Sequence, residues 1–267
     1  MKLWTLAAST LESFLHNRLI VVLLLVGIGI ILMMMIPLLG ARAKITGSNQ
    51  AMMESVVLEA ISEVVSFMSG LGSLLAAWAA TDSLVSELKA GTVLAVMARP
   101  VKRWEFLLGK YAGVLLLMAG YAAMMIGVTY LLAWLGGQHI HANPLVLFAY
   151  PLVRYAIYAA MAMLLATVFG SVMSMVCVMG IAIVNLLVQP GAPEWKPKLM
   201  WLKAGLYYVL PSTNLLSEER FLSLRQAALK PTTWMEHGTS LLYGLDYALV
   251  ILLLAMWSFR ARTLRRD

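Results

Sequence analysis

The residues that could carry out chemistry are few and scattered in this sequence. Two adjacent carboxylates, Glu218 and Glu219, would suit intramembrane proteolysis, but that chemistry also needs an arginine four positions on, where Ser223 stands. The histidines form no His-Glu-x-x-His zinc site, and no other nucleophile–base or metal-ligand set is evident. The sequence therefore predicts no catalytic residue, no bound metal and no cofactor held by this chain.

Copper handling stays open as a minor alternative. His139 and His141 lie two residues apart, and the chain contains 19 methionines, whose thioethers bind soft metals. Methionine is also an ordinary filler of apolar helices, so its abundance does not require a metal.

Arg154 and Asp246 are the two charged residues that fall within long apolar stretches. Charges inside a membrane are costly and usually face a partner or a polar pathway. We predict that the two side chains pair, or that they line the outer end of a path across the membrane. The alternative is that Arg154 reaches the membrane surface and Asp246 is hydrated separately.

The composition identifies the elements that must position these residues as membrane helices. Hydrophobic residues make up 61% of the 267 positions and charged residues only 12%, about half the fraction usual in a soluble domain. The formal net charge is +7, but no basic stripe is interleaved with aromatics, so we expect no nucleic acid partner. The single cysteine, Cys177, excludes an intramolecular disulfide. The chain is expected to sit in a lipid bilayer.

Six membrane spans are predicted from the uncharged apolar runs. The first is expected to be a retained span rather than a cleaved signal peptide, because its apolar run is too long. Asp82 should close the second span, and Pro151 should lie in the first turn of the fourth. The fourth and fifth should form a hairpin that turns near Gly170-Ser171. The spans are 19–41, 64–81, one within 111–138, two within 155–193, and 238–259.

An N-terminal segment, the loop 82–106 and a second long loop complete the predicted single domain, 1–267. Residues 1–17 have an apolar face and are expected to form an amphipathic helix at the membrane interface. Residues 190–237 form a large outer loop, whose apolar middle is too short to span the membrane and is interrupted by Pro211. We expect interfacial or re-entrant helices there. The fold class is thus all-α integral membrane.

The orientation follows from the basic residues. Six spans put both termini on one side, and Lys and Arg gather at both termini and in the loop after the second span. The positive-inside rule makes that side cytoplasmic.

The cytoplasmic loop 82–106 carries the most information. It begins with a short amphipathic segment that is expected to break at Gly91, followed by an apolar turn and the Arg99-Pro100 turn. A simple connector would use a few polar residues, so this loop is expected to offer a structured surface to a cytoplasmic partner.

This loop resembles the first cytoplasmic loop of ABC-2-type exporter permeases. The shared elements are Glu87, Gly91-Thr92, Arg99-Pro100-Val101, Arg103 and Leu108-Gly109-Lys110. The six-span layout, the amphipathic N-terminus and the large outer loop extend the resemblance over the whole chain.

The resemblance implies that the loop is a coupling helix that fits an ATPase subunit. The residues that would form or support this contact are Glu87, Gly91, Thr92, Arg99, Pro100 and Arg103. Two ATPase subunits would supply ATP and Mg²⁺ chemistry, since this chain has no phosphate loop. A second permease subunit, identical or a paralogue, would complete the complex in a bacterial-type plasma (inner) membrane.

Other readings remain open at this level. The basic residues of the loop would also serve as positive-inside anchors alone. An ion-coupled secondary transporter should show internal repeats and a broken helix with polar ligands, which are not evident. A membrane enzyme lacks a catalytic set, and a scaffold would not need the ordered loop.

Overall fold

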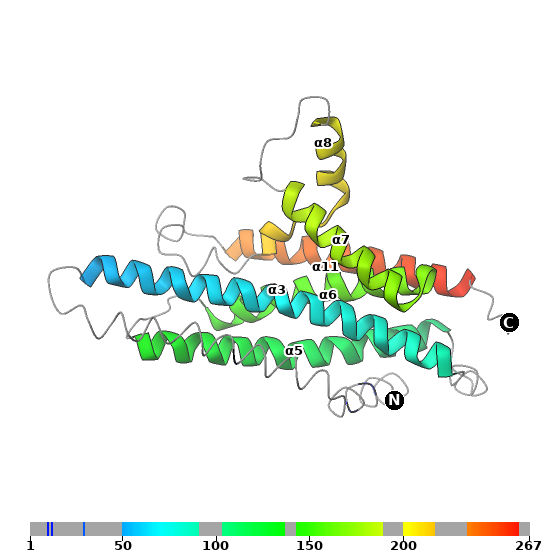
Figure 1. Cartoon of the computed structure of the whole chain (residues 1–267), viewed down its shortest axis with the longest axis horizontal. Helices are drawn as coiled ribbons and strands as arrows, with labels where there is room; N and C mark the ends of the chain where they lie inside the picture. Colours follow the sequence, from blue (N-terminus) through cyan, green and yellow to red (C-terminus); the bar gives the residue numbers. More distant parts are fainter. Residues whose placement is uncertain are drawn as a thin grey trace.

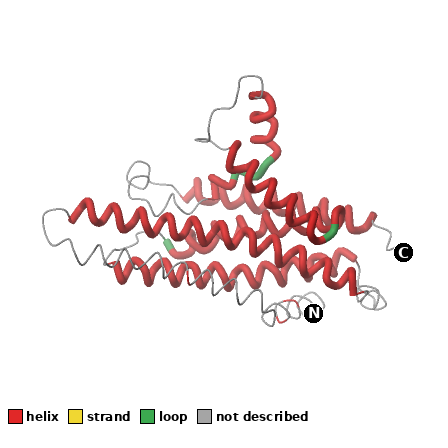
Figure 2. Tube along the Cα trace, in the orientation of Figure 1, coloured by secondary structure: helices red, strands yellow, loops and turns green. Residues whose placement is uncertain are grey.

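The computed structural model describes residues 50–90, 103–136, 143–188, 200–216 and 234–261, together with Thr10, Glu12 and Gly29. Every regular element in these ranges is helical, and they contain no strand (Figure 2). The all-α prediction is thus confirmed for this part of the chain. The predicted first span and the predicted amphipathic helix fall outside it, apart from those three single positions.

The long helices run side by side along the longest axis of the molecule, while the short α8 stands away from them (Figure 1). Four helices in the described ranges (α3, α5, α6 and α11) are long and apolar enough to cross a membrane, and α7 is shorter. The elements are α3 (Gln50–Ala90), α5 (Arg103–Gly136), α6 (Pro144–Phe169), α7 (Ser171–Val188), α8 (Met200–Val209), the 3₁₀ helix η2 (Thr213–Leu216) and α11 (Trp234–Ala261).

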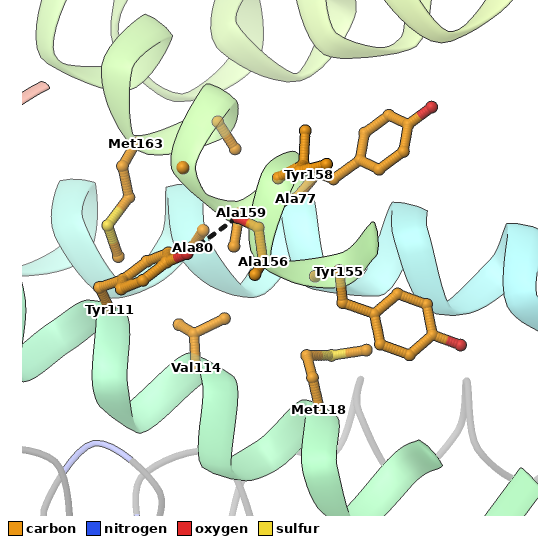
Figure 3. Close-up of a cluster of buried hydrophobic side chains, with 14 of the residues drawn as sticks. Ala77, Ala80, Tyr111, Val114, Met118, Tyr155, Ala156, Tyr158, Ala159 and Met163 are labelled. Atoms are coloured by element: carbon orange, nitrogen blue, oxygen red, sulfur yellow. Dashed lines mark hydrogen bonds between the residues drawn. The ribbon is translucent and has the colours of Figure 1, made fainter. Parts of the chain in front are cut away.

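Helix α6 is the centre of the bundle. It packs against α3, α5, α7 and α11, and every residue from Tyr155 to Met163 is buried. Alanines make up much of this stretch, and small side chains let neighbouring helices approach closely in a membrane. Figure 3 shows how side chains from α3 and α5 close around it.

Local sequence signals explain where α6 begins and ends. The Asn143 side chain caps the helix by accepting a hydrogen bond from the Leu145 backbone N–H at 2.9 Å, and Pro144 occupies the first turn. At the other end Gly170 has a φ of +83°, a conformation that glycine adopts without strain. The predicted turn near Gly170-Ser171 is therefore confirmed.

Two predicted boundaries are wrong. Pro151 lies inside α6, well beyond its first turn, because the Asn143 cap and Pro144 start the helix earlier. Asp82 does not close the second span: the apolar stretch able to cross a membrane runs from Ile61 to Ser86, and α3 itself continues to Ala90. Leu84 and Val85, beyond Asp82, are buried against the bundle core. At about 1.5 Å per residue, the 41 residues of α3 extend roughly 60 Å, twice the thickness of the hydrocarbon.

Buried tyrosines tie the helices together. The Tyr111 hydroxyl of α5 donates to the Ala156 carbonyl of α6 at 3.0 Å, the bond drawn in Figure 3. The Tyr121 hydroxyl donates to the Met68 carbonyl of α3 at 2.9 Å. The rings of Tyr121 and Tyr155 meet edge to face with centroids 5.9 Å apart.

These two rings close over Gly72 of α3. A Cβ atom at position 72 would lie 2.5 Å from the Tyr155 ring and 2.6 Å from the Tyr121 ring, and both rings are buried. Gly72 is thus required by the close approach of three helices.

We expect Gly72→Ala to destabilise the bundle by about 1–3 kcal/mol, because the added methyl must displace two packed rings. Gly70→Ala is the matched control, since nothing lies within 4 Å of a Cβ at that position. Thermal unfolding in detergent should show a lower midpoint for Gly72→Ala only. Equal midpoints for the two variants would contradict this packing.

Candidate functional site

The C-terminal end of α11 and the N-terminal end of α5 meet at one end of the bundle, which we call the basic end. The Arg103 guanidinium donates through Nη1 to the Arg260 carbonyl oxygen at 3.3 Å. One turn further on, the rings of Phe106 and Phe259 stack with centroids 6.3 Å apart and planes 20° from parallel. Both rings are almost fully buried, so the contact fixes α5 to α11.

Lys110 lies inside the bundle at this end rather than at its surface. Its side chain is only 6% exposed, and its ammonium lies 5.9 Å from the centroid of the Phe106 ring. A cation over an aromatic face is attracted by the ring quadrupole. Lys110 therefore takes part in the packing and is more than an exposed membrane anchor.

The predicted coupling residues flank this end. Glu87 lies in the last turn of α3, where the structure describes the backbone alone, and Arg103 begins α5. Residues 82–90 and 103–106 of the predicted loop are thus helical continuations of α3 and α5. Gly91, Thr92, Arg99 and Pro100 lie outside the described residues.

Arg154 and Asp246 are not brought together. The Arg154 guanidinium donates through Nη1 to the Ser69 hydroxyl of α3 at 3.3 Å, and Ser69 is fully buried. Asp246 lies on the exposed side of α11, and no ion pair joins the two residues in the described part of the chain. The reason is helical phase: α11 buries the stripe that includes Gly244 and Ala248, and Asp246 lies about 200° around the helix from each of them.

Sequence reasoning missed a polar contact that holds the end of α8 and the residues that follow it. The Asn185 amide of α7 donates to the Pro211 carbonyl at 2.9 Å and to the Thr213 hydroxyl at 3.2 Å. The Tyr247 hydroxyl of α11 donates to the Val209 carbonyl at 3.0 Å. A lone asparagine in an otherwise apolar run was the available signal. The contacts anchor the break between α8 and η2, which falls at Pro211 as the sequence predicts.

Metal binding finds no support in the described ranges, where no three His, Cys, Asp or Glu side chains form a group that could hold an ion. His139 and His141 lie outside them. His237, at the start of α11, shares a 3.0 Å hydrogen bond with the Tyr150 hydroxyl.

Comparison with known proteins identifies a family. A family model described as ABC-2 family transporter protein matches residues 10–264, which is nearly the whole chain. No curated protein matches the sequence.

We expect Phe259→Ala to cost roughly 3 kcal/mol, because the removed ring leaves a cavity beneath Phe106. Thermal unfolding in detergent should show a midpoint several degrees lower than that of the unmodified chain. Trp257→Ala is the control: its side chain is 71% exposed, and removing it should leave the midpoint almost unchanged. A Phe259→Ala chain as stable as the control would show that the basic end is not held by this stacking.

Proposed function

Because the chain belongs to the ABC-2 transporter family, we propose that this permease is the membrane subunit of an ATP-driven exporter and is coupled at its basic end to a separate ATPase. The observation that carries the proposal is the contact between α5 and α11 at the start of α5, where the chain re-enters the bundle after the loop that follows α3. A partner that moves this loop would act on helices that run the length of the bundle.

The proposed topology has six spans in a bacterial-type plasma membrane. Helices α3, α5, α6 and α11 supply four long spans and α7 a fifth, and residues 19–41 would supply the first. With six spans both termini lie in the cytoplasm, and the basic end faces the ATPase. The positive-inside rule supports this orientation, since Arg103 and Lys110 lie at that end.

The proposed mechanism is alternating access driven by nucleotide. Two ATPase subunits bind ATP and Mg²⁺ and close, while this chain contributes no phosphate loop. Because nucleotide favours the closed ATPase pair, closure shifts the population of permease conformations. Helix α3 is continuous from its buried middle to Ala90, so a displacement of the loop is transmitted along it without a break.

The path itself would form between this chain and a second permease subunit, either identical or a paralogue. Helices α7 and α11 expose many apolar side chains, which contact lipid or that second subunit. Arg154 of α6 contacts Ser69 of α3, so its charge lies inside the bundle. Asp246 would line the translocation path only if that path runs along the exposed side of α11.

A pull-down of the tagged chain from its native membrane in mild detergent tests the proposal. We expect a stoichiometric ATPase to co-purify. Glu87→Arg should remove most of it, because the substitution reverses the charge of a residue proposed to contact the ATPase subunit. Glu236 is an exposed carboxylate in the first turn of α11, at the opposite end of that helix, and Glu236→Arg should retain the ATPase. A chain that purifies alone, under conditions that keep known complexes intact, would contradict the proposal.

A further inference from the structure

A cavity of about 250 Å³ opens at the basic end, between α3 and the first two turns of α7. It lies beside the tight turn at Gly170 that joins α6 to α7. Its wall is formed by Trp78, Thr81 and Asp82 of α3 and by Ser171, Val172, Met175 and Val176 of α7.

Asp82 supplies the charge of this cavity. Its side chain is partly buried, and in the described ranges its carboxylate makes no hydrogen bond or ion pair. The bond from the Ser86 hydroxyl, 2.6 Å long, goes to the Asp82 backbone carbonyl and leaves the carboxylate unaffected. A carboxylate within an apolar helix bundle attracts a cation more strongly than one in bulk water.

The hydroxyl groups of Thr81 and Ser174, beside the cavity, already donate hydrogen bonds. The Thr81 hydroxyl donates to the Ala77 carbonyl at 2.9 Å and lies 3.3 Å from the Ser174 hydroxyl of α7. The Ser174 hydroxyl donates in turn to the Ser171 carbonyl at 2.9 Å. The hydroxyl–hydroxyl contact brings α7 close to α3 beside the cavity, while the protons of both groups are directed to carbonyls of their own helices. Ser171 is the other hydroxyl residue in the lining, so the wall offers few hydroxyl protons to a ligand rich in hydrogen-bonding groups.

The remaining wall is aromatic, aliphatic and thioether. Trp78 lies four residues before Asp82 and therefore projects from the same face of α3. Tryptophan offers the most favourable aromatic face to a cation, and a methionine thioether adapts to an apolar body. A single carboxylate is too few ligands for Ca²⁺ or Mg²⁺, which take six or more oxygens.

The apolar wall continues along α7. Val172, Val176, Met179 and Ile183 recur at helical spacing, and each is at least 43% exposed. The cavity is slightly smaller than the roughly 300–1,000 Å³ usual for drug-sized ligands. It therefore suits the charged head of a ligand whose apolar body lies along this stripe.

We propose that this cavity binds the head group of a lipophilic organic cation, such as a quaternary ammonium, with Asp82 as its counter-ion and Trp78 against its methyl groups. The assignment of such cations as transported cargo rests on the proposed function. The assignment of the binding site does not.

Equilibrium binding of radiolabelled benzyltrimethylammonium to the tagged full chain tests the site. The chain is placed in phosphatidylcholine nanodiscs, so that no anionic headgroup attracts the probe. We expect saturable binding that neopentylbenzene, the neutral isostere of the probe, does not displace. Asp82→Asn should weaken binding by at least about tenfold, and Trp78→Leu by about threefold to tenfold.

Glu63→Gln is the matched control, because Glu63 is an exposed carboxylate on the same helix outside the cavity. It should bind the probe like the unmodified chain. Absence of saturable binding, equal affinity of Asp82→Asn, or displacement by the neutral isostere would overturn the proposal. If Asp82→Asn does not purify in one monodisperse form, Val172→Lys tests the site instead. Its ammonium, at an exposed position of the cavity wall, should abolish binding of the probe. Unchanged affinity of this variant would overturn the proposal.

The two proposals fail separately. Binding is measured without the ATPase, and ATPase co-purification is measured without the cation. A chain that keeps its ATPase but does not bind the probe overturns the cation site alone.

Discussion

The constraint on which the rest of the structure depends is that lipid gives helices no hydrophobic reason to associate. An apolar side chain is as well accommodated by lipid as by another helix, so association relies on close packing and on internal hydrogen bonds. Here α6 provides both. Its alanine-rich middle is buried on all sides, and the Tyr111 hydroxyl reaches its backbone from α5. Gly72 of α3 has no side chain, and the rings of Tyr121 and Tyr155 occupy the space that a Cβ atom there would need.

Different kinds of contact hold the helices together in different parts of the bundle. At the basic end, the stacked rings of Phe106 and Phe259 fix α5 to α11, and Lys110 of α5 is buried beside Phe106. Elsewhere in the bundle, Tyr247 holds the end of α8 by the Val209 carbonyl, and Asn185 holds the segment between α8 and η2 by the Pro211 carbonyl. The contacts at the basic end include the stacking of Phe106 on Phe259 and the bond from Arg103 to the Arg260 carbonyl oxygen, so a partner that moves the loop would act on packed helices rather than on a loose connection.

Hydropathy and turn residues were enough to predict the membrane class, the turn at Gly170 and the helix break at Pro211. Hydropathy could not show that α3 continues past Asp82, because a charged residue ends an apolar run without ending a helix. The placement of Pro151 failed for a similar reason: the stronger start signal at Asn143-Pro144 lies outside the apolar run.

The candidate site was predictable only where it is local in sequence. Glu87 and Arg103 were predicted because they flank one loop, and the structure places them in the last turn of α3 and at the start of α5. The contact of Arg154 with Ser69 and that of Asn185 with Pro211 join distant positions and depend on helix phase, which one sequence does not specify. From the sequence, Asp82 was predicted only to end the second span. Its cavity could not be predicted, because it forms where α7 packs against α3.

Site-directed photocrosslinking in native membranes tests the central claim, that the basic end docks an ATPase, most directly. A photoreactive residue would replace Glu87 or Trp104 at the basic end, or Trp234 at the opposite end of α11, where the side chain is 71% exposed. Crosslinks to an ATPase subunit from positions 87 and 104 but not from 234 are the predicted result. An ATPase crosslinked from position 234, or none crosslinked from the basic end, would contradict the account.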